Sequence, residues 1–223
     1  MPKKNMSQIG LLGGTFDPFH DGHQAMADFC LKNLGFKKII FIPCKQPSHR
    51  SAPQACAGDR LWMLYLSIAN QKNKIVSTIE YNHPELKYTA QTLKAIRKQY
   101  PYESLNFILG MDSFNTLNQW EEYRSLLNYT HLIVMNRPGY PLTTNPALEH
   151  LLENHLLKDG QHTNQTHGCI KLIQMPPQEV SATSIRNTLQ SNRHHGLAVN
   201  HDVKTYIKTH QLYQTNLWNP HYE

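Results

Sequence analysis

Two histidines stand three residues apart, shortly after a pair of glycines, in the segment GGTFDPFHDGH that runs from Gly13 to His23. An apolar run at residues 9–12 precedes this segment, and a stretch with the character of a helix follows it. A strand, a glycine-rich turn and a helix in this order bring backbone N–H groups and a helix N-terminus up to a phosphate. His20 and His23 would share one face where the helix starts, and imidazole N–H groups can donate to phosphate oxygens. The segment therefore predicts a nucleoside triphosphate site.

Each part of this segment has a simpler interpretation when it is taken alone. A glycine pair is a common turn signal, and two histidines can be half of a metal site or a solvated pair. The segment is neither the G-x-G-x-x-G dinucleotide motif nor a P-loop, which ends in Gly-Lys-Ser or Gly-Lys-Thr. Because the parts occur together between a strand and a helix, we favour the phosphate site.

A second candidate phosphate site is the segment VSATSIR at residues 180–186. Ser181 or Thr183 can cap the helix that follows, so that the first N–H groups of this helix point at an anion. Side chains on a helix lean toward its N-terminus, which lets the planar fork of Arg186 reach the same anion. The alternative is an ordinary capped helix with a surface arginine.

Several separated motifs together resemble one family. They are GGTFDPFHDGH, IPCKQPSHR at 42–50, YTAQTL at 88–93, ILGMDSF at 108–114, LNQW at 117–120, HLIVMNRPGYP at 131–141 and VSATSIR. In order and spacing they resemble the (T/H)-x-G-H nucleotidyltransferase superfamily and, within it, the bacterial nicotinate-mononucleotide adenylyltransferases. The resemblance extends from about residue 9 to about residue 213.

The resemblance implies that His20 and His23 bind the ATP phosphates, with His23 nearest the transferred group, and that Arg186 completes the catalytic set. Gly110 would let a base or ribose lie against the backbone, and Asp112 would accept from ribose hydroxyls, although Asp112 could equally cap a short helix. Ala182 stands where the family often has serine. The full set implied for ATP is Gly13, Gly14, Thr15, Phe16, His20, His23, Gly110, Asp112, Ser181, Thr183 and Arg186.

For the second substrate, the resemblance implies that the nicotinate ring stacks on Trp120. Its carboxylate would meet backbone amides near Thr89 and at Glu121, whose own acidic side chain we expect to face solvent. The alternative for Trp120 is a packing role. Lys45, His49 and Arg50 could contact the phosphate of the mononucleotide, or form a solvated basic loop. This loop departs from the family, with Ser48 in place of a second proline and Cys44 in place of asparagine.

The reaction implied is transfer of the adenylyl group of ATP to nicotinate mononucleotide, with Mg²⁺ accompanying ATP, in NAD synthesis. Such a site needs phosphate donors rather than a nucleophile, because catalysis is mostly positioning and charge stabilisation. Nicotinamide mononucleotide and phosphopantetheine are alternative acceptors, although YTAQTL and LNQW argue against phosphopantetheine. A nucleic-acid-binding module is a further alternative, but the lysines are dispersed rather than clustered. The other histidines match no metal-site spacing, so we predict no protein-bound metal.

The composition agrees with a phosphate-binding enzyme. The 223 residues carry a formal charge of +6, which suits phosphate-rich partners. The four cysteines form no C-x-x-C pair, and no stretch is apolar enough for a signal peptide or a membrane span. We therefore expect a cytoplasmic protein without membrane or nucleic-acid partners. The length suits one nucleotidyltransferase domain over residues 1–215, with a C-terminal helical part from about 176, and a tail at 216–223.

Alternating strands and helices predict an α/β protein with a Rossmann-like, doubly wound parallel sheet and a small C-terminal helical lobe. Strands are expected at 9–12, 38–42, 75–80, 105–109, 131–135 and 170–175. Helices are expected at 23–34 before a stop at Gly35, after a cap at Asp59, at 90–100 after a cap at Thr89, near 145–157 within a surface insertion at 143–168, at 183–190 and at 199–210. Ligands bind at the carboxyl ends of such strands, so the loops after Leu12, Ile42 and Leu109 should form one rim.

Overall fold

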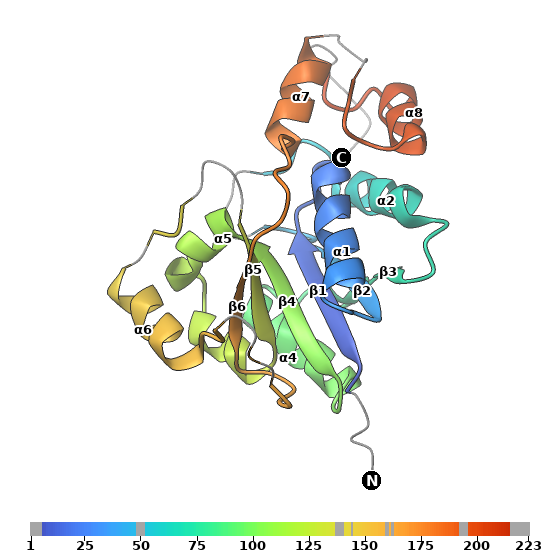
Figure 1. Cartoon of the computed structure of the whole chain (residues 1–223). Coiled ribbons are helices and arrows are strands. Elements are labelled where there is room, and N and C mark those ends of the chain that lie inside the picture. Colours follow the sequence, from blue (N-terminus) through green and yellow to red (C-terminus); the bar gives the residue numbers. More distant parts are fainter. Residues whose placement is uncertain are drawn as a thin grey trace.

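Six parallel strands form the centre of the protein, seen in a computed structural model (Figure 1). The structure describes residues 6–47, 52–136, 141–143, 145–158, 161, 163–191 and 196–214. The strands are β1 (Gln8–Gly14), β2 (Lys38–Pro43), β3 (Lys74–Val76), β4 (Ser104–Gly110), β5 (His131–Met135) and β6 (Ile170–Ile173). Their order in the sheet is β3-β2-β1-β4-β5-β6, and every neighbouring pair is parallel. The order reverses between β1 and β4, which is the point where doubly wound sheets bind ligands.

Helices cover both faces of this sheet. One face packs against α1 (Asp21–Asn33) and α2 (Ala57–Ile68), and its core includes Leu12, Phe41 and Ile108. The other face packs against α4 (Thr89–Gln99), α5 (Met111–Asn115) and α6 (Pro146–His155). Consecutive residues of a strand point to opposite faces, so Leu11 lies in the second core and Leu12 in the first. The predicted doubly wound α/β fold is confirmed.

A separate apolar cluster joins the end of the chain to α2. It contains Met63 of α2 with Ile185 and Leu189 of α7 (Ala182–Gln190), and Val203 and Ile207 of α8 (His201–Thr209). Figure 1 shows α7 and α8 above the carboxyl edge of the sheet, close to α2. The predicted C-terminal helical lobe is therefore present. The domain limit at residue 215 stays a prediction, and the tail at 216–223 lies outside the described residues.

The strand expected at 75–80 is wrong in its second half. β3 ends at Val76, and Ile79 and Glu80 belong to a short helix, α3 (Ile79–Asn82). Ile79 is buried in the core beside α4, and the Glu80 carboxylate accepts a hydrogen bond from Thr92 Oγ1 at 3.0 Å. These tertiary contacts favour a helical turn over continued pairing at the edge of the sheet.

Two expected helix caps are also wrong. Cys56, not Asp59, caps α2: its sulfur accepts the N–H of Asp59 at 3.3 Å. Thr89 is the first residue of α4 rather than its cap, and Tyr88 precedes it in extended conformation. Gly35 ends α1 as expected, with φ +67. α1 begins at Asp21, two residues earlier than expected, because His20 caps it.

The remaining helical turns connect these elements. The segments η1 (Leu117–Gln119) and η2 (Tyr123–Asn128) are 3₁₀ helices between α5 and β5. α6 lies inside the surface insertion expected at 143–168. None of the helices described is long and apolar enough to cross a membrane.

Candidate active site

The carboxyl ends of β1 and β4 meet at the point where the strand order reverses, and both end in glycine. A side chain at Gly14 would lie only 2.7 Å from the ring of Phe16. A side chain at Gly110 would collide with the Asp112 carboxylate. Glycine is therefore needed at both positions, because the ring of Phe16 and the carboxylate of Asp112 occupy the space that a side chain would take. α1 starts after β1 and α5 after β4, so two helix N-termini face this edge.

His20 and His23 are held by the backbone at the start of α1. His20 Nδ1 accepts the N–H of Gly22 at 3.2 Å, and His23 Nδ1 accepts the N–H of His20 at 3.3 Å. The two rings stack with centroids 3.8 Å apart. Because both Nδ1 atoms are acceptors, the ring proton of each neutral histidine belongs on Nε2. The helix start thus selects the tautomer in which Nε2 can donate to an anion.

Two phenylalanine rings pack against the histidine pair and hold it in place. The His23 ring stacks on Phe19 at 5.3 Å and meets the edge of Phe16 at 5.0 Å. Phe16 is buried and adopts φ +51, a left-handed conformation that is uncommon for a bulky residue. His20 is only 7% exposed. The imidazoles are therefore preorganised rather than mobile surface groups.

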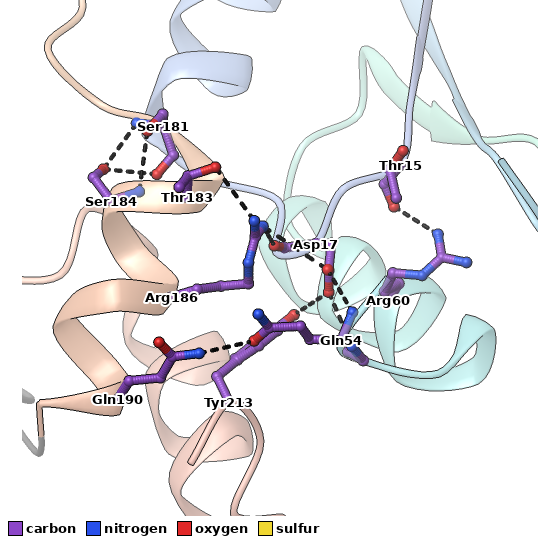
Figure 2. A network of polar contacts seen from close by, with 11 residues as sticks. Thr15, Asp17, Gln54, Arg60, Ser181, Thr183, Ser184, Arg186, Gln190 and Tyr213 are labelled. Atoms are coloured by element: carbon purple, nitrogen blue, oxygen red, sulfur yellow. Dashed lines mark hydrogen bonds and ion pairs between the residues drawn. The ribbon is translucent and has the colours of Figure 1, made fainter. Parts of the chain in front are cut away.

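The second motif lies against the first, although they are separated by more than 150 residues. Ser181 caps α7: its Oγ accepts the N–H of Ser184 at 3.1 Å, and Ser184 Oγ accepts the N–H of Ser181 at 3.1 Å. Arg186 Nη1 donates to the main-chain oxygen of Asp17 at 2.7 Å, and Nη2 donates to Thr183 Oγ1 at 3.3 Å (Figure 2). Of the two expected caps, Ser181 is therefore the cap, while Thr183 orients the arginine.

Asp17 is a central residue that the sequence motif contains but that sequence reasoning did not single out. Its buried carboxylate accepts the N–H groups of Gln54 at 2.9 Å and Ala55 at 3.1 Å, and the hydroxyl of Tyr213 at 2.8 Å. Arg186 Nη1 lies 3.8 Å from Asp17 Oδ2. The loop after β1 is thus joined to the loop after β2 and to the C-terminal lobe.

Arg60 is a second residue that the sequence reasoning missed. It is 1% exposed, and its guanidinium donates to the main-chain oxygens of Thr15 at 2.6 Å, Cys44 at 2.7 Å and Lys45 at 2.8 Å. It therefore joins the loop after β1 to the loop after β2. The sequence held a signal: Arg60 occupies the same helical stripe as Leu64 and Ile68, four and eight residues further on, so its side chain must enter the core.

Trp120, expected to stack on the pyridine ring, lies against the face of the sheet that α4 and α5 cover. The Trp120 ring is half-buried and meets the Phe107 ring edge-on at 6.4 Å. A side chain at Gly13 would lie 3.3 Å from that same Phe107 ring, so one aromatic side chain separates Trp120 from the glycine-rich loop. Thr89 is half-buried at the start of α4, and Glu121 is exposed, as expected.

The half-buried carboxyl group of Glu80 lies beside Cys44 and Lys45 of the loop after β2. Burial raises the pKa of Glu80, while the hydroxyl of Thr92 acts to lower it. Burial, and next the charge of Glu80, raise the pKa of the Cys44 thiol to about 11. Lys45 is exposed and its Nζ lies 3.5 Å from the main-chain oxygen of Tyr81. His49 and Arg50 lie outside the described residues.

Two cavities of the described structure differ in their relation to this edge. A cavity of about 770 Å³ lies at the amino ends of β5 and β6, lined among others by Arg124, Asn154 and His167. A cavity of about 170 Å³ borders His20, Gln24 and Asn200. The larger one is remote from the motifs, so the site is assigned from converging donors rather than from volume. Within the described ranges, no three His, Cys, Asp or Glu side chains are grouped to hold a metal ion.

Comparison with known proteins shows the family to which the chain belongs. A model of the cytidylyltransferase-like family matches residues 11–188. A protein of Coxiella burnetii (strain RSA 331 / Henzerling II), named "Probable nicotinate-nucleotide adenylyltransferase", is 40% identical over 210 residues, which cover 92% of this chain and 98% of that protein. A protein of the same name from Klebsiella pneumoniae is 36% identical, covering 94% of this chain and 99% of its own.

A solved structure shares the fold. The Plasmodium falciparum nicotinic acid mononucleotide adenylyltransferase complexed with NaAD superposes with a TM-score of 0.73, covering 94% of this chain and 98% of its own, at 19% identity. At that identity the likeness supports the architecture alone.

Proposed function

The chain belongs to the cytidylyltransferase-like family, and from that membership and its site we infer a nicotinate-nucleotide adenylyltransferase. The enzyme transfers the adenylyl group of ATP to nicotinate mononucleotide, which gives nicotinate adenine dinucleotide and pyrophosphate. This is a step of NAD synthesis. The relatives that carry this name are matched over nearly their whole length, so the inference does not rest on a shared segment alone.

One observation carries the assignment at the level of chemistry. The structure gathers His20, His23 and Arg186 around the loop after β1, together with the N-termini of α1 and α7. Each of these groups is a donor or a positive dipole end, and all suit the oxygens of a triphosphate. Adenylyl transfer requires such an array, because negative charge builds up on the phosphate oxygens while the acceptor phosphate attacks.

The roles of individual residues are proposals. His23 Nε2–H stabilises the charge that develops at the α-phosphate, and His20 binds beside it. Arg186 and the first N–H groups of α7, after Ser181, hold the β- and γ-phosphates. The backbone of Gly13, Gly14, Thr15 and Phe16 lines the nucleotide, and Gly110 with Asp112 binds its ribose. No step needs a covalent intermediate, since the mononucleotide phosphate is itself the nucleophile.

The acceptor pocket is also a proposal. Trp120 stacks on the nicotinate ring, and its carboxylate accepts from main-chain N–H groups near Thr89 and at Glu121. Lys45, with His49 and Arg50, contacts the mononucleotide phosphate. The proximity of Trp120 to Phe107, and of Phe107 to Gly13, supports a pocket next to the ATP loop.

We propose that Mg²⁺ enters with ATP rather than from a protein cage. The Asp17 carboxylate accepts three hydrogen bonds and faces Arg186, so its lone pairs are already engaged. A cation bound mainly by phosphate oxygens and water fits such a surrounding, and it would neutralise phosphate charge. We propose no nucleic-acid partner. The four cysteines are free thiols, which accords with a proposed cytoplasmic location.

The direct test is a pyrophosphate-release assay with ATP and three separate acceptors: nicotinate mononucleotide, nicotinamide mononucleotide and phosphopantetheine. Nicotinate mononucleotide should give the fastest release. Faster release with phosphopantetheine, or release independent of any acceptor, would assign the site to another reaction of the family.

A further inference from the structure

The hydroxyl of Tyr213 reaches the active-site loop from the far end of the chain. It donates to Asp17 Oδ1 at 2.8 Å, across 196 positions of sequence, and Tyr213 is 7% exposed (Figure 2). Tyr213 also adopts φ +65, a conformation that is unfavourable for a bulky residue and that persists only where its surroundings hold it. The main-chain N–H of Leu212 donates to the oxygen of Ile207 at 3.0 Å, which fixes the turn before Tyr213 to α8.

This contact determines how the Asp17 carboxylate is turned. Oδ1 accepts from Tyr213 and from the N–H of Ala55, while Oδ2 accepts from Gln54 and faces Arg186 Nη1 at 3.8 Å. The main-chain oxygen of the same aspartate accepts from Arg186 Nη1 at 2.7 Å. Without the tyrosine hydroxyl, Oδ1 would keep only the N–H of Ala55 as a donor, so the carboxylate would be held less firmly in its place opposite Arg186.

We propose that Tyr213 is a positioning residue for the ATP site, acting through Asp17 on Arg186 and on the loop that carries His20. The proposal rests on the proposed function, in which Arg186 and His20 hold the ATP phosphates. Tyr213 touches neither substrate in this account. It docks the C-terminal lobe on the loop after β1, where the N–H of Asp21 also donates to the oxygen of Ala198 at 2.9 Å.

Tyr213→Phe removes the hydroxyl and keeps the ring. Tyr206→Phe is the matched control. Tyr206 also belongs to the C-terminal lobe, but its Oη donates to the carboxylate of Asp59 on α2 at 2.8 Å rather than to Asp17. Calorimetric titration with ATP should show a Kd about tenfold higher for Tyr213→Phe, which corresponds to about 1.4 kcal/mol. Tyr206→Phe should stay within about twofold of the wild type by the same conversion, while thermal unfolding reports the stability of both. An unchanged Kd in Tyr213→Phe, or equal losses in both variants, would overturn the proposal.

Steady-state kinetics distinguishes a specific effect on the ATP site from a general loss of stability. Tyr213→Phe should raise KM for ATP and lower kcat, and leave KM for nicotinate mononucleotide unchanged. The same substitution made in an Arg186→Lys background should have a much smaller effect, because the two residues act through one carboxylate. Full additivity of the two substitutions would show that Tyr213 does not act on Arg186.

A measurement on the wild type covers the case in which Tyr213→Phe does not fold. If docking of Tyr213 favours ATP binding, ATP must favour docking to the same degree. ATP should therefore slow hydrogen exchange of the Leu212 amide and its neighbours in the 207–214 segment. Bound ATP without any slowing would refute the coupling.

These readouts also separate this inference from the proposed function. A wild type that binds ATP but makes no dinucleotide would refute the proposed reaction, while the comparison of ATP affinities would still decide the role of Tyr213. A wild type that does not bind ATP would overturn both.

Discussion

At the residue scale, the imidazole tautomers of His20 and His23 are set by the protein backbone. Two N–H groups of the helix start occupy the Nδ1 atoms, so each ring directs its proton away from the helix. The same hydrogen bonds cap α1. The hydrogen bonds that start the helix therefore also orient the two rings for their proposed role as phosphate donors, so the rings need not reorganise during the proposed reaction.

His23→Ala should retain the fold and lose turnover. Loss of one transition-state donor typically lowers kcat by about 10²–10³. Stability should fall by about 1 kcal/mol, because His23 Nδ1 also helps to cap α1. Steady-state kinetics and thermal unfolding measure the two effects, and His150→Ala, at an exposed position on α6, is the control. A folded variant with near-native kcat would exclude His23 from the mechanism.

Arg186→Lys should raise KM for ATP although the substitution keeps the positive charge. The guanidinium reaches the Asp17 oxygen and Thr183 Oγ1 with separate nitrogens, and a lysine ammonium cannot reproduce that fork. KM for ATP should rise while KM for nicotinate mononucleotide stays constant. Initial rates at varied concentrations of each substrate check this, and unchanged kcat and KM for ATP would make Arg186 a structural residue only.

At the element scale, Trp120 is the residue that follows η1, in the short connection between η1 and η2. Trp120→Ala should weaken binding of nicotinate mononucleotide by about 1–3 kcal/mol, the scale of base–aromatic stacking. It should also abolish the fluorescence change that this ligand causes. Trp62→Ala is the control, because Trp62 lies on α2 and is 53% exposed. Unaltered affinity in Trp120→Ala would remove the stacking role.

The start of β5 contains a histidine that burial keeps neutral. His131 Nδ1 accepts the N–H of Cys169 at 3.1 Å, and Nε2 lies 3.0 Å from the oxygen of Gln165. Burial lowers the pKa of His131 from 6.5 to about 4. The unfolded chain therefore takes up the proton first as the pH falls, so this residue reduces stability progressively below pH 6.5.

The expected loss in the free energy of unfolding between pH 6.5 and pH 5 is about 1.6 kcal/mol, because the slope rises from about half of 1.4 kcal/mol per pH unit at pH 6.5 towards its full value at pH 5. Urea unfolding at the two pH values measures it. His131→Gln should flatten this dependence, whereas His150→Gln at an exposed position should not. The same pH slope in His131→Gln and the wild type would contradict the account.

Some elements could be predicted from the local sequence, whereas others depend on tertiary contacts. Local signals were sufficient for β5 and for the αL stop at Gly35, because periodicity and turn chemistry act over a few residues. They failed at Ile79 and Glu80, where packing against α4 decides the conformation. The burial of Arg60 could have been predicted from its place on the buried stripe of α2. Its three carbonyl partners could not, because they lie in two loops that only the tertiary fold brings together.

At the scale of the whole molecule, the strand order determines which motifs meet. β1 and β4 are neighbours although 89 residues lie between them in the sequence, so the loop after β1 faces the glycine at the end of β4. The C-terminal lobe then brings Arg186 and Tyr213 to the same loop. The resemblance of the separated motifs to one family was enough to predict that Arg186 lies near the loop after β1. The role of Tyr213 could not be predicted, because a single tyrosine near the chain end has no local signature.

Selectivity for the acid over the amide follows from the proposed acceptor pocket. A carboxylate accepts from two backbone N–H groups, whereas an amide offers one acceptor and turns its NH₂ toward the other donor. A buried donor without a partner costs about 1–3 kcal/mol, and each 1.4 kcal/mol is about a factor of ten. Nicotinate mononucleotide should thus exceed nicotinamide mononucleotide in kcat/KM by at least about tenfold.

A single competition experiment tests the central claim most directly. The enzyme receives ATP with equal concentrations of nicotinate mononucleotide and nicotinamide mononucleotide in one vessel, and mass spectrometry measures the two dinucleotides at low conversion. Their ratio equals the ratio of the two kcat/KM values. The account predicts nicotinate adenine dinucleotide in at least about tenfold excess, by the donor arithmetic above. Equal amounts, an excess of the nicotinamide product, or no dinucleotide at all would contradict it.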